Sequence, residues 1–211
     1  MDTTISLKTI LERANYFISR CEIDKAINSY FDCIKYFPSC IEAYNNISVL
    51  LYERLQYRKA IYFLKKAISI DPLNPYLYRT LGIILLEQGY EFSAYRSLQI
   101  SINIKPDFYD AHFNLGNLLS GLARSGKYNH FMAISSYENA LKFNRRYAIA
   151  HLNMANLYKD FKSHLLALEN YKKAIILDSN LSLSYQKVAE ILFELGFHSK
   201  SNKARKIFSN Y

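Results

Sequence analysis

The sequence predicts an all-α protein, a solenoid of about six helix-turn-helix repeats, on the strength of three observations. Small residues recur at spacings of 34, 34, 39, 34 and 34 residues (Ala26, Ala60, Ala94, Ala133, Ala167 and Ser201). An aromatic slot, filled by tyrosine or histidine, follows five of them after 18 residues (Tyr44, Tyr78, His112, His151 and Tyr185). Between these markers, apolar residues recur at steps of three and four, which is the period of an amphipathic helix. A fixed period of this length is typical of a repeat array.

Each repeat is expected to contain two antiparallel helices. In the third repeat, residues 78–85 form the inner face of the first helix, and residues 94–101 form that of the second. The small residue Ala94 allows the two helix axes to approach, because a larger side chain would overpack the seam. Gly89 lies between the helices, where a residue with positive φ ends a helix at little cost. Pro106 marks the end of the second helix, because proline disfavours helix at the residue before it.

This pattern resembles the tetratricopeptide repeat, whose signature contains an aromatic residue, Leu-Gly, tyrosine, Ala-x-x-x-Phe and proline in that order. The third repeat, with Tyr78, Leu81-Gly82 and Ala94, matches it most closely. The resemblance implies a right-handed superhelix in which the first helix of every repeat lines a concave groove. It divides a single domain, residues 1–211, into repeats 7–40, 41–74, 75–108, 109–147, 148–181 and a degenerate capping repeat 182–211.

The fourth repeat is 39 residues long and therefore carries a five-residue insertion. The extra residues fall between Leu119 and Ala133, and we expect the first helix to run on by about a turn and stop at Gly126. An insertion of this kind can carry binding residues. A neutral variation in length is the simpler interpretation.

Nothing in the sequence predicts catalysis or a cofactor. The cysteines (Cys21, Cys33 and Cys40) lack the paired spacing of zinc ligands, and Cys33 falls in a small-residue slot that favours a place in the core. His112 and His151 fill the aromatic slot of their repeats, which favours packing over ligand binding. There is no glycine-rich phosphate loop and no recognisable nucleophile. We therefore predict a non-catalytic protein without a metal or cofactor.

The composition predicts a soluble, cytoplasmic chain. No apolar stretch approaches the ~20 residues that a membrane span needs, and the N-terminus lacks the apolar run of a secretory signal. The net charge is +9, but the basic pairs are dispersed and accompany no nucleic-acid-binding motif. A solvated surface explains these pairs better than specific binding of nucleic acid or anionic lipid.

The side chains expected in the groove carry a different charge from the whole chain. Transfer of the family geometry places four bases and eight acids there, a net charge of −4 (Lys8, Arg79, Lys159 and Lys187; Glu12, Glu42, Glu53, Glu87, Asp110, Asp160, Glu190 and Glu194). The groove is therefore expected to prefer a neutral or basic partner segment.

Asparagines occupy two fixed places in the first helices, two residues after the aromatic slot and one turn later (Asn46, Asn114, Asn117, Asn153 and Asn156). A row of amides can hydrogen-bond the backbone of an extended peptide, at about 0.5–1.5 kcal/mol per bond. Residues 111–117 and 150–156 resemble the repeats attached to O-linked N-acetylglucosamine transferases, and this resemblance implies an asparagine ladder that holds a substrate chain. Alternatively, the amides stabilise neighbouring turns. Both interpretations are open at this level.

We predict a scaffold or adaptor that binds an extended or helical segment of a partner protein in the groove. Besides the asparagines, the predicted binding residues are aromatic or basic (Tyr52, Tyr76, Arg79, Phe113 and Lys187). The alternative is a substrate-recruiting accessory of a glycosyl- or sulfotransferase. Self-association through the apolar end repeats is a further possibility.

One family activity is not expected, the binding of chaperone C-terminal tails. Family members that do this surround the terminal carboxylate with three cations. Here Lys187 stands at one of these places, and Phe113 and Leu183 replace the two lysines. A desolvated carboxylate would lack its counter-charges.

Overall fold

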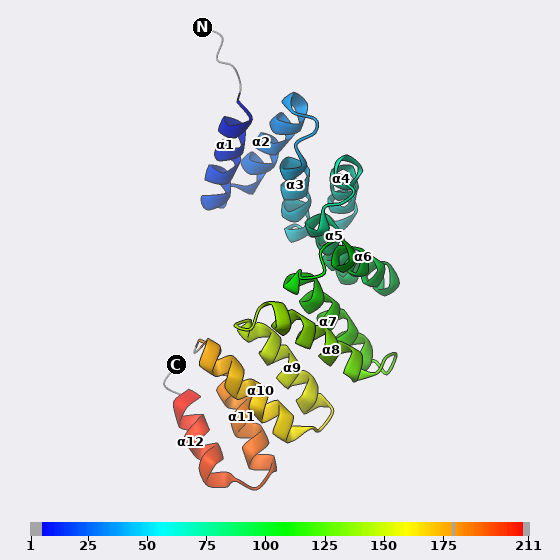
Figure 1. Ribbon diagram of the computed structural model, residues 1–211. Coiled ribbons are helices and arrows are strands. Elements are labelled where there is room, and N and C mark those ends of the chain that lie inside the picture. The colour runs from blue at the N-terminus through cyan, green and yellow to red at the C-terminus, as the bar shows by residue number, and fades with distance from the viewer. Residues whose placement is uncertain (1–5, 179, 209–211) are drawn as a thin grey trace. The chain divides into compact units, whose positions relative to one another are not determined.

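The computed structural model describes residues 6–178 and 180–208, which form twelve α-helices and no β-strand (Figure 1). The helices follow one another in pairs, and each predicted repeat contains one pair: α1 (Leu7–Ser19) and α2 (Ile23–Tyr36), α3 (Ile41–Glu53) and α4 (Tyr57–Ile70), α5 (Pro75–Glu87) and α6 (Glu91–Ile104), α7 (Tyr109–Arg124) and α8 (His130–Phe143), α9 (Ala148–Asp160) and α10 (His164–Leu177), α11 (Ser182–Glu194) and α12 (His198–Phe208). The predicted all-α array of helix pairs is confirmed.

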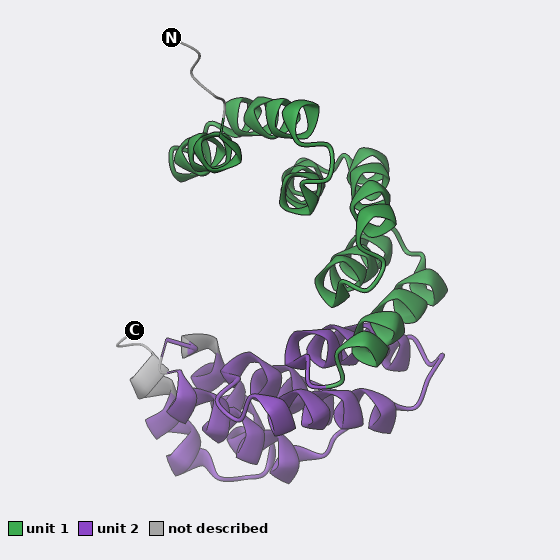
Figure 2. Cartoon of the chain, turned by 45° about the horizontal axis from the view of Figure 1, so that its top comes forward, with its two compact units in different colours: residues 1–106 green, residues 107–211 purple. Residues whose placement is uncertain are grey.

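The chain divides into two compact units, residues 1–106 and residues 107–211 (Figure 2). We call them unit 1, which holds α1–α6, and unit 2, which holds α7–α12. Within each unit every helix packs against its hairpin partner, and the second helix of a pair contacts the first helix of the next. The prediction that residues 1–211 form one domain stays a prediction.

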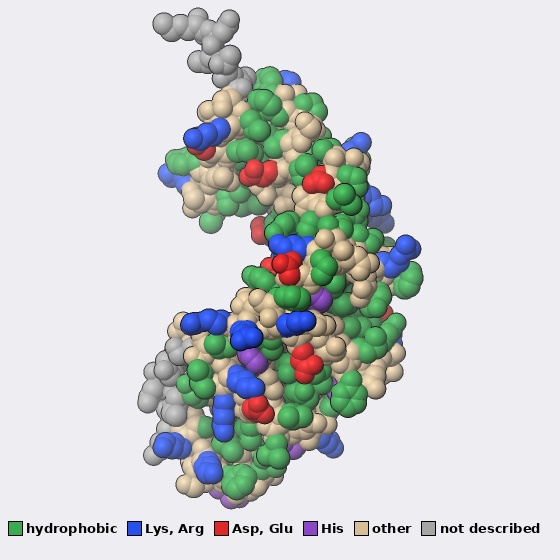
Figure 3. Space-filling view, in the orientation of Figure 1, with side chains coloured by type: hydrophobic (Ala, Val, Ile, Leu, Met, Phe, Trp, Pro, Cys, Tyr) green, Lys and Arg blue, Asp and Glu red, His purple; other side chains and the backbone are tan. Residues whose placement is uncertain are grey.

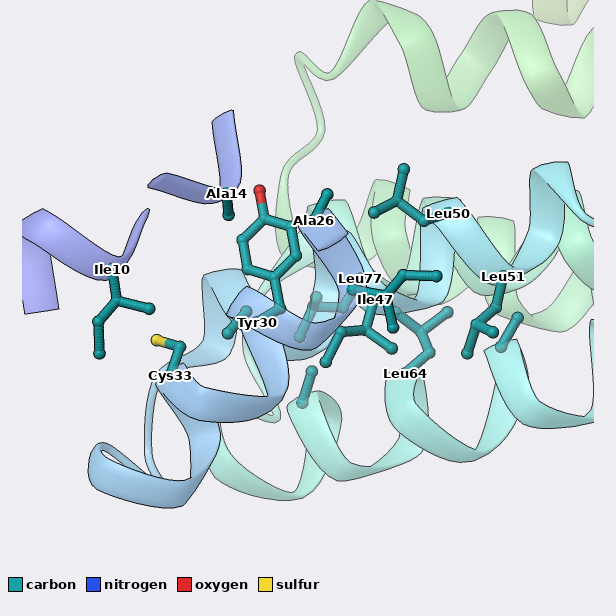
Figure 4. Close-up of a cluster of buried hydrophobic side chains, with 14 of the residues drawn as sticks. Ile10, Ala14, Ala26, Tyr30, Cys33, Ile47, Leu50, Leu51, Leu64 and Leu77 are labelled. Carbon is teal, nitrogen blue, oxygen red and sulfur yellow. The ribbon is translucent and has the colours of Figure 1, made fainter. Parts of the chain in front are cut away.

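Two rows of small residues set the distance between the helices of each pair. The predicted row on the second helices is fully buried (Ala26, Ala60, Ala94, Ala133, Ala167 and Ser201). A matching row on the first helices is buried at the same repeat position (Ala14, Ser48, Gly82, Gly116, Ala155 and Ala189). A Cβ at Gly82 would meet the Leu98 side chain and the backbone carbonyl of Ala94 within 3.3 Å, so the helix backbones approach closely here. Larger side chains such as Tyr30, Ile47 and Leu64 then fill the space between neighbouring pairs (Figure 4).

Each hairpin turn contains one residue with positive φ, between 58° and 79° (Cys21, Leu55, Gly89, Gly126, Lys162 and Gly196). The N–H of the following residue donates to a carbonyl five residues back, as from Tyr90 to Leu85 at 2.9 Å. This bond satisfies a carbonyl that the end of the helix would leave free, and it is the hallmark of a Schellman turn. Three turns hold this conformation with a residue other than glycine.

Local sequence also explains where several helices begin and end. Asn74 caps α5, because its side-chain oxygen accepts a hydrogen bond from the N–H of Tyr76 at 3.2 Å, and Pro75 suits the first helical position. Asn129 caps α8 in the same way. α6 ends at Ile104, two residues before Pro106, as predicted.

The insertion lengthens α7. This helix has 16 residues, whereas α5 and α9 have 13 each, and the chain leaves it at Gly126 with φ 75°. The first helix of the fourth repeat therefore runs on by about a turn, as expected. The added turn ends with Arg124.

Cys33, His112 and His151 have the packing roles expected from their positions. Cys33 is fully buried, and burial, with a further contribution from Cys40, raises the pKa of its thiol to about 12. The ring of His112 stacks on Phe143 with centroids 5.7 Å apart. The Nδ1 atom of His151 lies 3.0 Å from the side-chain oxygen of Asn170.

The turns of unit 1 offer a matched test of backbone strain. Leu55, which is 71% exposed, has φ 59°, so Leu55→Gly should stabilise unit 1 by about 0.5–1 kcal/mol. Gly89→Ala should destabilise it by about 1 kcal/mol through the backbone alone, because the new Cβ meets no atom within 4 Å. Urea unfolding of both variants is the measurement, and shifts of the same sign would contradict the strain argument.

α7 offers a similar test of the small-residue seam. A Cβ on Gly116 would lie 2.6 Å from the ring of Tyr137, so Gly116→Ala should destabilise unit 2 by about 1–3 kcal/mol. Gly121, five residues on, has free space around it, and Gly121→Ala should stabilise the helix by up to about 1 kcal/mol. Thermal unfolding of the two variants checks this, and equal effects would show that the seam does not limit side-chain size.

Candidate functional site

The predicted asparagines belong to different units, and three of them surround one pocket of unit 2. Asn117 of α7 and Asn153 and Asn156 of α9 line a cavity of about 270 Å³. Ser120, Arg124 and Tyr137 complete the lining. Asn46 lies in unit 1, and Asn114 lies on α7 outside the lining.

A hydrogen bond from a buried tyrosine orients an asparagine in three repeats. The hydroxyl of Tyr137 donates to Oδ1 of Asn117 at 2.9 Å, and that of Tyr171 donates to Oδ1 of Asn156 at 2.6 Å. Tyr30 donates to Asn15 at 3.2 Å. The paired residues are 15, 20 and 15 residues apart along the chain, and the longer separation contains the five-residue insertion. The same contact therefore recurs at one position of the repeat.

A second set of hydrogen bonds, donated by asparagine side chains, connects neighbouring repeats. Nδ2 of Asn153 donates to Oδ1 of Asn117 at 2.8 Å, and Nδ2 of Asn46 donates to the hydroxyl of Tyr30 at 2.9 Å. Asn114 differs, because its Nδ2 donates to the carbonyl of Asp110 in its own helix. The amides at these positions thus have a structural role.

The internal bonds leave the pocket rich in donors. Oδ1 of Asn117 accepts two hydrogen bonds, and Oδ1 of Asn156 accepts one. Among the described residues, neither Nδ2 donates to a partner. A carboxamide whose oxygen is occupied offers its N–H groups to a ligand. The two amides are therefore oriented to bind an acceptor such as a carbonyl oxygen.

The tyrosines stay protonated at neutral pH. Burial raises the pKa of Tyr137 to about 12, and the neighbouring Ser120, Arg124 and Asn153 side chains reduce this effect. Burial also raises the pKa of Tyr171, with further contributions from Asp160 and Glu190. Their hydroxyls are consequently dependable donors to Asn117 and Asn156.

Charges around the pocket are balanced by ion pairs. Arg124 contacts Asp160 at 2.6 Å, and Lys159 contacts Glu190 at 2.5 Å. Lys187 also reaches Glu190, at 3.4 Å. The acidic excess predicted for the groove is therefore largely neutralised here. Within the described part of the chain, no three His, Cys, Asp or Glu side chains gather as metal ligands.

The other predicted binding residues do not line this pocket. The ring of Phe113 instead packs on the rings of Tyr137 and Tyr147, with centroids 5.9 and 4.9 Å apart. Lys187 belongs to the Glu190 ion pairs.

Three predicted residues lie in unit 1 and belong to contacts of that unit. Tyr52 packs on Tyr57 with ring centroids 5.9 Å apart. Tyr76 is half-exposed and accepts a hydrogen bond from Nζ of Lys105 at 3.1 Å. Arg79, on α5, is half-buried.

Sequence reasoning missed Tyr137 and Arg124. The signal for Tyr137 was available, since tyrosine stands where the repeat signature has phenylalanine, and the extra hydroxyl needs a partner. Arg124 belongs to the insertion. The length of the insertion predicts that the first helix of the fourth repeat is extended, but it does not predict where the side chain of Arg124 lies.

Comparison with known proteins finds tetratricopeptide repeat proteins among the similar chains, and no family model matches the chain. A BBSome complex member BBS4 homolog of Drosophila melanogaster is 29% identical over 104 residues, 49% of this chain and 21% of the relative. A UDP-N-acetylglucosamine–peptide N-acetylglucosaminyltransferase of Giardia intestinalis is 24% identical over 168 residues, 78% of this chain and 11% of the relative. Human tetratricopeptide repeat protein 6 is 25% identical over 146 residues, 67% of this chain and 26% of the relative. The chain thus spans only a fraction of each relative.

Solved structures show the same fold. The PilF protein of Pseudomonas aeruginosa matches with a TM-score of 0.79 and 18% identity, over 95% of this chain and 88% of that one. YrrB, described as a tetratricopeptide repeat protein with an unusual peptide-binding site, matches with a TM-score of 0.59 and 22% identity, over 83% of this chain and 88% of that one.

The helix pairs, the repeat spacing and these comparisons show that the chain has the fold of tetratricopeptide repeat proteins. Among the residues that the structure describes, no helix is long and apolar enough to cross a membrane.

The Tyr137 hydroxyl should make stability depend on alkaline pH. Its folded pKa of about 12 exceeds the ordinary value of 10.0, so its contribution is complete below pH 10 and is lost as the pH rises toward 12. Tyr137→Phe should lower the free energy of unfolding by about 1 kcal/mol at neutral pH. Above about pH 10, the free energy of unfolding of this variant should fall less steeply than that of wild type, by up to about 1.4 kcal/mol per pH unit. Denaturant unfolding between about pH 8 and about pH 12 measures both effects. The control is Tyr128→Phe, because the side chain of Tyr128 is 48% exposed. An equal change in the pH dependence of that variant would contradict the assignment of the effect to Tyr137.

Proposed function

We propose that this protein is a non-catalytic scaffold or adaptor, and that the pocket of unit 2 binds the backbone of an extended partner segment. The observation that carries the proposal is the orientation of Asn117 and Asn156, whose oxygens are occupied by tyrosine hydroxyls. Both asparagines line the pocket, and among the described residues neither amide N–H group has an acceptor in the protein.

An extended peptide supplies the complementary groups. Each of its residues carries a carbonyl oxygen, and the asparagines stand on neighbouring first helices, α7 and α9. At about 1 kcal/mol for each hydrogen bond, two or three contribute roughly a thirtyfold to 150-fold gain in affinity. Because Arg124 and Lys159 are paired with acids, a neutral segment fits the pocket better than a strongly charged one.

The relatives agree with a role in assembly. One is named as a homolog of a BBSome complex member, and the solved structure of YrrB is described as having a peptide-binding site. Both belong to the same class of repeat protein, and neither name gives the partner of this chain.

A second candidate is a substrate-recruiting accessory of a glycosyltransferase. The observation that favours it is the match to the N-acetylglucosaminyltransferase of Giardia intestinalis over 168 residues. A partner that is itself a transferase would support this candidate over a general scaffold.

The test is an affinity pull-down from native lysate with mass spectrometry. The double variant Asn117→Ala, Asn156→Ala removes the oriented amides, and Asn139→Ala removes an exposed asparagine of α8 that lies outside the pocket. Partners of the pocket should be depleted about tenfold or more from the double variant and retained on the control. Circular dichroism establishes that both variants are folded.

Recovery of the same partners at the same level on all three baits would show that the amides serve only the fold. Loss from both variants alike would place the binding surface elsewhere in unit 2.

A further inference from the structure

A second pocket of unit 2 lies between α10 and α12, with α11 beneath it. Its cavity volume is about 340 Å³. Ile175, Val188 and Ala204 form an apolar floor, and Ile176, which is 82% exposed, forms one lip. We call this recess the α10–α12 groove. It shares no residue with the pocket of the asparagines.

The rim of the α10–α12 groove is basic. Lys172, Lys200 and Lys203 surround the floor, all three are exposed, and no carboxylate lines the groove. Within the described residues, none of the three lysines forms an ion pair. Nζ of Lys200 lies 5.2 Å from the ring centre of Phe197. On the face that Figure 3 shows, lysine and arginine side chains outnumber acidic ones over α7–α12.

The preceding junction, between α8 and α10, shows that this rim does not follow from the fold. All eight lining positions carry different residues there, and five of the changes alter the charge or polarity of the rim and floor (Glu138, Lys142, Leu166, Glu169 and Asn170 in place of Lys172, Ile176, Lys200, Lys203 and Ala204). At that junction the Asn170 side chain contacts His151 at 3.0 Å and donates to the carbonyl of Leu166. Two acids and a hydrogen-bonded amide thus replace two lysines and an alanine.

We propose that the α10–α12 groove binds an acidic amphipathic helix of a partner protein. Apolar side chains of such a helix would enter the recess, and flanking carboxylates would meet the three lysines. Burial of apolar area would provide affinity, and the lysines would select acidic over basic partners. The three lysines would also attract an anionic membrane, and vesicle binding is therefore one of the outcomes of the test.

The test uses fluorescence anisotropy at low ionic strength with labelled model helices of about four turns. One peptide has leucines along one face and glutamates beside them, and its matched peptide has lysines in place of the glutamates. Wild-type protein should bind the acidic peptide at least about tenfold more tightly than the basic one. The two groove variants are Ile176→Asp and the double variant Lys200→Glu, Lys203→Glu, and each should weaken binding of the acidic peptide by about tenfold.

The control is the double variant Lys142→Glu, Lys162→Glu. It changes the net charge of unit 2 equally, and Lys142 also lies over an aromatic ring, that of Phe143. It should change affinity by less than about twofold. The Asn117→Ala, Asn156→Ala variant should bind the acidic peptide as wild type does, which separates this groove from the asparagine pocket.

Three results would overturn the proposal. Equal weakening in the control would show unspecific charge attraction, and failure of wild type to discriminate the two peptides would show that the lysines do not select. Co-sedimentation with phosphatidylserine vesicles, lost in the groove variants and without peptide binding, would assign the surface to membranes. The side chains substituted in the groove variants and in the lysine control are all exposed, so circular dichroism is expected to show that these variants are folded.

Discussion

The close approach of two helices in every repeat is the constraint on which the other features of this protein depend. It requires a small residue on each helix at the same level, as with Gly116 on α7 opposite the α8 segment that contains Ala133 and Tyr137. A larger side chain would separate the helices and displace the tyrosine ring. Because the ring is fixed, its hydroxyl reaches Asn117, and the amide acquires one orientation. The chemistry of the pocket is thus a consequence of the packing beneath it.

The asparagines show that a structural and a binding role are compatible. Asn117 uses its oxygen to join α8 and α9 to α7, and this use leaves its N–H groups to the pocket. The two interpretations that the sequence leaves open describe different atoms of the same side chain. An amide suits this double use because its donor and acceptor ends are distinct. A hydroxyl at the same place would rotate and present no defined face.

Repetition also makes the exceptions informative. Within unit 2 the two junctions are built from helix pairs of the same pattern, and their surfaces differ through the side chains at matching positions. Arg124 is available to the pocket because the insertion lengthens α7, and the α10–α12 groove is open and basic because its residues differ from those at the α8–α10 junction. Binding specificity in an array of this kind arises at such departures from the repeat.

The sequence by itself determined the class of fold, the number of helix pairs and the position of the insertion. These follow from local properties, namely the 34-residue period, the helical spacing of apolar residues and turn residues such as Gly89, Gly126 and Gly196. It also indicated the asparagines. Tertiary structure alone decided which of them meet, because Asn117 and Asn153 are 36 residues apart and contact each other only through the packing of α7 and α9. It likewise decided that Tyr137 and Arg124 belong to the pocket and that Tyr52, Tyr76 and Arg79 do not. A side-chain hydrogen bond depends on distances of a few tenths of an ångström, and the periodicity of a sequence specifies the face of a helix but not those distances.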